Sequence, residues 1–253
     1  MFHLKNWGVT ILLTFLATGI IGANTIDPYR DPRLPVERRV ADLLSRMTIE
    51  EKCEQLQQMD VARLQVFDGV VSPESLERVF KGKTPGVVML DQGGDITSNT
   101  IKSRDLQNFL RKNSRLGIPA LFVTGGTQGV IAQGATIFPS PIALGATWNP
   151  PLIREMSAKI ADEASAMGAA QVLGPSFALG RDPRFGGIEL CFGECPTLVT
   201  EMGLAYLDGL QGKGVASGLP PNKVFGTALH FTGWGVPSGG LFGAEVSLSS
   251  RSL

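Results

Sequence analysis

The chain has 253 residues, of which 43% are hydrophobic and 18% charged, with 31 Gly and 16 Pro. This composition is typical of a globular, loop-rich α/β protein and excludes a fibrous or disordered chain. Lys and Arg together number 23, as do Asp and Glu, so no net charge draws the chain to nucleic acid, and no nucleic-acid partner is expected. The length suits one large domain or two small ones.

The N-terminus has the pattern of an export signal. Lys5 supplies a positive charge, an apolar run spans residues 9–21, and Gly22-Ala23 offers small residues for cleavage. We therefore expect a signal peptide over residues 1–23 and a secreted or periplasmic chain. An N-terminal anchor helix is the alternative, because the run is slightly long for a signal.

Cysteine and histidine are scarce, which limits the kinds of site this chain can build. The three cysteines Cys53, Cys191 and Cys195 exclude a complete disulfide framework within a monomer, because their number is odd. Cys191 and Cys195 can pair across a tight loop or remain thiols. His3 lies in the expected signal, so His230 is the only other histidine, and a His-rich zinc or iron site is excluded. We predict no metal and no cofactor.

The first part of the chain is predicted to be helical. Residues 36–47 place apolar side chains at helical spacing with charges between them. Thr48 and Glu51 have the spacing of a capping box and start a second helix, which we expect to run to about Met59. A third, short helix begins at Pro73, whose missing N–H is harmless in a first turn.

Strands and helices then alternate. Four apolar runs are predicted to be buried strands, at 87–90, 120–123, 172–173 and 224–231. Helices are predicted at 104–115, 150–167 and 196–212, and loops at 91–100 and 133–149. This alternation implies βαβ units and a parallel sheet. Because a closed eight-stranded barrel takes about 250 residues, we predict an α/β fold with a partial TIM-type (β/α)8 barrel, incomplete at the C-terminus.

A series of motifs in chain order carries a family resemblance. The motifs are Tyr29-Arg30-Asp31-Pro32, Arg46-Met47-Thr48-Ile49-Glu50-Glu51-Lys52, Leu116-Gly117-Ile118-Pro119, Gly134-Ala135-Thr136-Ile137-Phe138-Pro139, Leu144-Gly145-Ala146-Thr147-Trp148-Asn149, Arg181-Asp182-Pro183-Arg184-Phe185-Gly186-Gly187, His230-Phe231 and Gly239-Gly240. Together they resemble the N-terminal domain of glycoside hydrolase family 3, the β-glucosidase and β-xylosidase family. We assign residues 24–253 to an incomplete copy of this domain.

The resemblance implies a barrel followed by a second α/β domain, and retaining hydrolysis with an Asp nucleophile and a Glu acid/base. In retaining enzymes these two carboxyl groups lie about 5–5.5 Å apart. The resemblance places both beyond residue 253, so we expect no catalytic residue in this chain and no glycoside hydrolysis by it as written.

Several sugar-binding positions of the family also differ here. An acidic residue, a His, an Arg, a Glu, an Asp and a Lys of the family correspond in this chain to Gly125, Gln128, Gly187, Leu190, Cys195 and Leu229, whereas the family His is kept as His230. Each lost charge-assisted hydrogen bond removes roughly 1.5–3 kcal/mol. Weaker sugar binding is therefore expected.

Five residues remain candidates for substrate binding: His230, Arg181, Asp182, Arg184 and Trp234. Each has a structural alternative. An Arg beside Asp182 can instead fix its own loop through an ion pair, and Trp234 can pack in the core. His230 ends a strand at the edge where barrel enzymes bind substrate. Asp91 also follows a predicted strand, but no motif surrounds it.

Three interpretations follow. The chain is a truncated or mispredicted part of a family 3 β-glucosidase, a secreted non-catalytic carbohydrate-binding relative, or a structural module completed by a partner chain. The expected ligand is a β-linked glucoside or xyloside, and open barrel edges also predict self-association. The first interpretation is favoured, because an independent binding protein is expected to end on a covered edge.

Overall fold

A computed structural model describes residues 26–212, 218–230 and 233–249. The expected signal peptide at 1–23 lies outside these residues, as does Phe231 at the end of the last predicted strand. The chain forms two compact units, Met1–Met47 and Thr48–Leu253. Among the described residues, no helix combines the length and the apolar character needed to cross a membrane.

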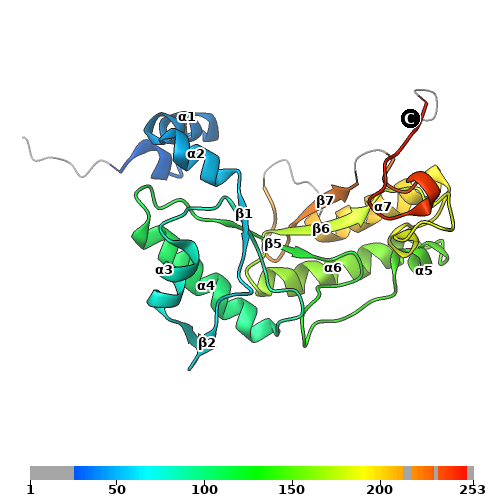
Figure 1. Ribbon diagram of the computed structural model, residues 1–253, viewed down its shortest axis with the longest axis horizontal. Helices are drawn as coiled ribbons and strands as arrows, with labels where there is room; N and C mark the ends of the chain where they lie inside the picture. The colour runs from blue at the N-terminus through cyan, green and yellow to red at the C-terminus, as the bar shows by residue number, and fades with distance from the viewer. Residues whose placement is uncertain (1–25, 213–217, 231–232, 250–253) are drawn as a thin grey trace, which may run out of the picture. The chain divides into compact units, whose positions relative to one another are not determined.

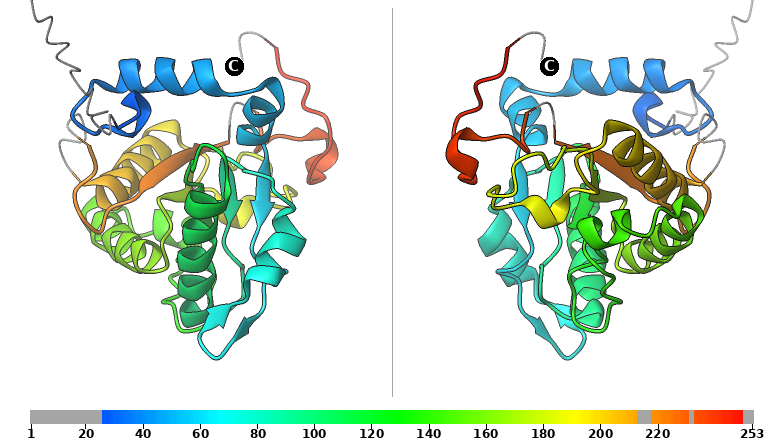
Figure 2. Two further views of the ribbon diagram at one scale, coloured as in Figure 1. Left: turned by 90° about the vertical axis from the view of Figure 1, so that its left-hand side faces the viewer. Right: turned by 90° about the vertical axis from the view of Figure 1, so that its right-hand side faces the viewer.

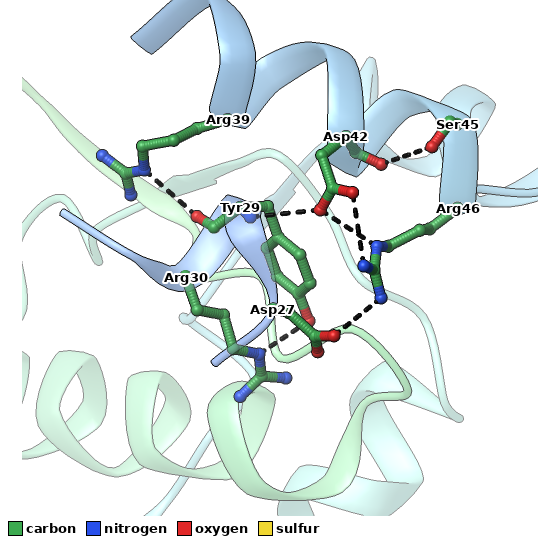
Figure 3. Close-up of polar contacts among 7 residues, drawn as sticks. All are labelled: Asp27, Tyr29, Arg30, Arg39, Asp42, Ser45 and Arg46. Atoms are coloured by element: carbon green, nitrogen blue, oxygen red, sulfur yellow. Dashed lines mark hydrogen bonds and ion pairs between the residues drawn. The ribbon is translucent and has the colours of Figure 1, made fainter. Parts of the chain in front are cut away.

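The first unit consists of the 3-10 turn η1 (Pro28–Arg30) and helix α1 (Val36–Arg46), which confirms the helix predicted at 36–47. A polar network joins the two elements (Figure 3). The Tyr29 amide donates to Asp42 at 3.1 Å, and the Arg46 guanidinium donates to both Asp42 and Asp27. The turn is therefore fixed to α1 by charged side chains.

The second unit begins with helix α2 (Ile49–Gln55), and the capping box is confirmed. The Glu51 amide donates to Thr48 Oγ1 at 3.3 Å, and the Thr48 amide donates to the Glu51 carboxylate at 2.9 Å. The prediction that α2 runs to Met59 is wrong, because residues 58–60 pair with another strand instead. Long-range backbone pairing overrides the local helical pattern here.

Five parallel strands form the sheet, in the order β1-β4-β5-β6-β7. They are β1 (Gln58–Asp60), β4 (Val87–Met89), β5 (Leu121–Gly125), β6 (Gln171–Ser176) and β7 (Phe225–Leu229). The four predicted strands are confirmed, and β1 was missed. Within the described residues the sheet ends on β1 and β7 without closing, which agrees with a partial barrel. A separate hairpin joins β2 (Val66–Phe67) to β3 (Val70–Val71).

Helices connect successive strands of the sheet (Figures 1 and 2). They are α3 (Pro73–Phe80), α4 (Ile96–Asn113), α5 (Pro141–Gly145), α6 (Pro150–Ala166) and α7 (Pro196–Gln211). Helix α4 begins earlier than predicted, because the Asp95 side chain accepts from the Ser98 amide and caps it. The loop predicted at 133–149 contains the short helix α5.

The two faces of the sheet differ in burial. Residues level with each other in parallel strands point to the same side, and Val88 pairs with Phe122 while Thr124 pairs with Val172. All four are buried, with the hydrophobic ones in one core with side chains of α4, α6 and α7. On the opposite face, Phe225 of β7 is 51% exposed. The helix-covered face is therefore the core, and the other face is partly open.

Candidate functional site

The loops that follow β6 and β7 pack together at the carboxyl-terminal edge of the sheet. The Gly186 amide donates to the Gly240 carbonyl at 3.2 Å, which joins the two loops. Gly235 lies so close to the first loop that a Cβ on it would come within 2.3 Å of the Leu179 carbonyl oxygen. Because parallel-barrel proteins place substrate sites at this edge, these loops form the candidate site.

Two of the predicted site residues bind each other. The Asp182 carboxylate accepts from Nε of Arg184 at 3.0 Å, from its terminal nitrogen at 2.7 Å and from its amide at 2.9 Å. These hydrogen bonds lower the pKa of Asp182 to about 2. The two side chains therefore fix the loop, as the structural alternative proposed. A sugar-binding role for either stays a prediction.

Arg181 differs from Arg184 in its surroundings. Its side chain is exposed, and within the described part of the chain no hydrogen bond or ion pair holds its guanidinium. The Arg181 amide donates to the Leu179 carbonyl, so the backbone is fixed while the side chain extends from the loop. Arg181 is therefore the cation of this loop that remains available to a ligand.

Four aromatic rings gather beside this loop. The imidazole of His230 stacks on Trp234, with 3.8 Å between the ring centroids and 11° between the planes. Trp234 contacts Phe185 edge to face at 4.7 Å and Phe242 at 5.5 Å. Phe185 is buried, and Phe242 is 64% exposed. Trp234 therefore packs against a small core, as its structural alternative describes, and its role in substrate binding stays a prediction.

His230 is held in an apolar setting. Its Nδ1 atom is buried and has no hydrogen-bond partner among the described residues. Burial lowers the pKa of His230, because the charged imidazolium loses hydration in such surroundings. The ring is therefore neutral near pH 7.

Gly187 makes room for this arrangement. A Cβ at position 187 would lie 2.8 Å from the Trp234 ring and 2.9 Å from the Phe185 ring. The space next to Gly187, where the family resemblance implies a sugar-binding Arg, is therefore occupied by two aromatic side chains. At Gly125, the other altered position with a glycine, the Gln92 amide lies 3.4 Å from where a Cβ would stand.

Asp91 has an ion-pair partner that the sequence did not predict. Lys102 of α4 is buried and donates to the Asp91 carboxylate at 2.9 Å. The Asn99 side chain also binds the Asp91 backbone, accepting from its amide and donating to its carbonyl. Asp91 is therefore bound to α4 by an ion pair. A lysine at one polar position of an amphipathic helix gave no signal for this contact.

The cysteines are not linked to each other in this structure. Cys191 is buried beside Ala178 and Phe185, and burial raises the pKa of its thiol to about 11. Cys195 is exposed at the start of α7. Over residues 26–212, 218–230 and 233–249, no three His, Cys, Asp or Glu side chains cluster closely enough to hold a metal ion.

A separate apolar hollow of about 450 Å³ lies between α5 and α6. Phe138, Leu144, Leu152 and Met156 are among its lining residues, as are the charged Glu155 and Lys159. Its lining comes from these two helices, the segment before α5 and Thr147 between the helices, and none of it from the loops after β6 and β7. Because catalytic residues of barrel enzymes come from the carboxyl ends of strands, the loop edge is the stronger candidate.

Known proteins resemble this chain over most of its length. A β-xylosidase from Formosa agariphila is 35% identical over 147 residues, which are 56% of this chain and 20% of that protein. Another protein of that organism is 34% identical over 238 residues, 89% of this chain and 30% of its own length. The β-glucosidase C of Emericella nidulans is 32% identical over 222 residues, covering 82% of this chain and 34% of the relative. The chain thus spans about a third of its curated relatives.

Solved structures share the fold. A β-glucosidase from Erythrobacter marinus superimposes with a TM-score of 0.75 at 32% identity, covering 86% of this chain and 28% of the other. A D270A mutant β-glucosidase from Listeria innocua, solved with laminaribiose, gives 0.71 at 29% identity, covering 86% and 29%. Residues 48–252 match the glycosyl hydrolase family 3 N terminal domain. The chain therefore belongs to glycosyl hydrolase family 3, within the N-terminal barrel domain of that family.

Proposed function

We propose that this chain takes part in the hydrolysis of β-linked glucosides or xylosides by holding a sugar at the carboxyl-terminal edge of its sheet. The observation that carries the proposal is the stacking of His230 on Trp234 at the edge where the loop with the exposed Arg181 also lies. An imidazole with one open edge and a free guanidinium can both donate hydrogen bonds to sugar hydroxyls. Relatives named as β-glucosidases and β-xylosidases support this class of ligand.

We further propose that residues 1–253 by themselves do not catalyse the hydrolysis. Retaining hydrolysis needs two carboxyl groups about 5–5.5 Å apart, one of them free to attack the sugar. Two carboxylates at the candidate edge are already engaged, Asp91 by Lys102 and Asp182 by Arg184. A carboxylate in a close ion pair is a weaker nucleophile, and Asp182, whose pKa is lowered to about 2, is also a poor proton donor.

A non-catalytic carbohydrate-binding role is the second candidate. It is favoured by the same edge, where an aromatic stack is present and where Asp91 and Asp182 are both bound to cations. Neutral donors and ring faces are the usual means of holding a neutral sugar. The two candidates differ in turnover and share the binding step.

The test has a catalytic arm and a binding arm. The 253-residue chain is incubated with nitrophenyl β-glucoside and β-xyloside, and no release of nitrophenol is expected. Turnover that a sugar-like inhibitor blocks, and that Asp182→Asn abolishes, would contradict the claim of inactivity.

In the binding arm, glucose, xylose and cellobiose are added during thermal unfolding. A ligand that binds only the folded state raises the melting temperature. We expect a rise for the wild-type chain, a smaller rise for His230→Ala, and an unchanged rise for Asn108→Ala, an exposed position on α4. The binding proposal fails if no sugar shifts the melting temperature, or if His230→Ala shifts as much as the wild type.

Completion of the barrel by another chain, or by a second copy, is a separate proposal. It is supported by the outer strands β1 and β7 and by the open face that carries Phe225. Uncovered strand edges promote association. Sedimentation over a range of concentrations tests it, and a monomer that unfolds cooperatively at every concentration would contradict it.

A further inference from the structure

The His230–Trp234 contact has a geometry that restricts the imidazole. The rings are nearly parallel at 3.8 Å, so one face of the His230 ring is covered by the indole. Trp234 is in turn held by two perpendicular rings, Phe185 at 4.7 Å and Phe242 at 5.5 Å. The indole face toward His230 is therefore not available to a sugar.

The two nitrogens of His230 are in different surroundings. Nδ1 is buried without a hydrogen-bond partner. Among the described residues, Nε2 is not such a buried, unpartnered atom. A buried N–H without an acceptor is costly and rare. We therefore assign the proton of the neutral ring to Nε2, which leaves Nδ1 as the buried lone pair. In this tautomer the Nε2 edge of the ring can donate a hydrogen bond.

Gly187 is needed for the indole to occupy its place. Its backbone angles are φ −117° and ψ 23°, which other residues also adopt, so the glycine is not required by the backbone. The restriction is steric, since a Cβ would meet the Trp234 ring at 2.8 Å. Gly187 thus couples the loop after β6 to the position of the indole.

We propose that Trp234 is a positioning residue that holds the His230 ring so that Nε2–H points outward as the hydrogen-bond donor to a hydroxyl oxygen of a neutral sugar. The ligand part of this inference rests on the proposed function. The positioning part rests on the stack, on the enclosed Nδ1 and on the space at Gly187.

The experiment reads the His230 ring by NMR in a His3→Gln background, which leaves one histidine in the chain. The ¹⁵N shifts of the two ring nitrogens report the tautomer, and a pH titration reports the pKa. Trp234→Leu removes the stacking face, and Trp234→Phe keeps a ring there. Gly187→Ala displaces the indole. Gly186→Ala is the matched control, because its methyl meets only an ordinary contact at 3.4 Å.

We expect the wild-type ring to be the Nε2–H tautomer with a pKa below 6.5. Trp234→Leu and Gly187→Ala should mix the two tautomers and raise the pKa toward 6.5, because the ring becomes hydrated. Trp234→Phe and Gly186→Ala should stay close to the wild type. The inference is overturned if folded Trp234→Leu and Gly187→Ala both keep the wild-type tautomer and pKa.

Addition of glucose or methyl β-xyloside separates the two claims. A sugar-dependent shift of the Nε2 resonance, weakened several-fold in affinity by Trp234→Leu, supports both. If the Trp234 variants alter the ring but no sugar shifts it, the positioning role stands and the proposed sugar function fails. If sugar shifts the ring equally in the wild type and in Trp234→Leu, the positioning role fails and sugar binding stands.

Discussion

The close contact between α6 and α7 depends on Gly209. A Cβ at this position would lie 1.9 Å from Ser157 Oγ and 2.3 Å from the Arg154 carbonyl oxygen. The serine side chain can rotate, but the carbonyl belongs to the backbone of α6 and cannot move without separating the helices. Gly209→Ala therefore strains the contact that holds α7 against the core.

The expected cost follows from two opposing effects. Overpacking in a protein core costs about 1–3 kcal/mol, and a clash with backbone belongs at the upper end of that range. Alanine is a better helix former than glycine by roughly 0.8–1 kcal/mol, which offsets part of the cost. The net destabilisation is about 2 kcal/mol, or roughly 4–8 °C in melting temperature for a domain of this size.

Circular dichroism during thermal unfolding measures this shift, with urea unfolding as a second readout. Gly203→Ala is the matched control on the same helix, because its methyl would meet the far edge of the Phe177 ring at 2.3 Å. That half-buried ring can turn aside, so we expect a change smaller than 1 kcal/mol. The reasoning is refuted if Gly209→Ala melts at or above the wild type, or if both variants are equally destabilised.

Three further predictions concern polar groups. Tyr206→Phe should cost about 1–3 kcal/mol, measured by urea unfolding, because the buried Tyr206 hydroxyl donates to the Gly126 carbonyl, which would lose its partner. Asp91→Ala should destabilise more than Lys102→Met in the same assay, because it leaves the buried Lys102 ammonium without its carboxylate, and equal losses would contradict this. His230 should destabilise the fold in acid. Because its folded-state pKa is lowered, its contribution to the free energy of unfolding is complete above pH 6.5 and is lost as the pH falls through the folded-state pKa. His230→Gln should remove this loss from the pH dependence of the unfolding free energy.

Most of the local structure was predictable from the sequence. The capping box of Thr48 and Glu51 and the proline at the start of α3 act through neighbouring backbone groups, so their effect depends on nearby residues alone. The four apolar strands were predictable because burial on both faces of a parallel sheet requires apolar side chains throughout. Strand β1, with the residues Gln58-Met59-Asp60, lacks that pattern, and only its pairing with β4 makes it a strand.

The candidate site was predictable in place but not in arrangement. The loop motif and the position of His230 at a strand end located the edge of the sheet, because parallel strands bring their carboxyl ends together. Which of Arg181 and Arg184 would bind Asp182 was not decided by spacing alone, since both are close to it in sequence. The structure pairs Arg184 with it and leaves Arg181 exposed.

By itself, then, the sequence determined the family, the parallel α/β fold and the edge of the sheet at which the candidate site is proposed. These follow from local signals and from the order of the motifs. The tertiary structure alone decided that Trp234 lies beneath His230, that Gly187 gives it room, and that Lys102 binds Asp91. Gly187 and Trp234 lie in different loops, and Lys102 lies on α4 while Asp91 precedes it, so these contacts depend on how the loops and helices pack around the sheet. No periodicity along the chain specifies that packing.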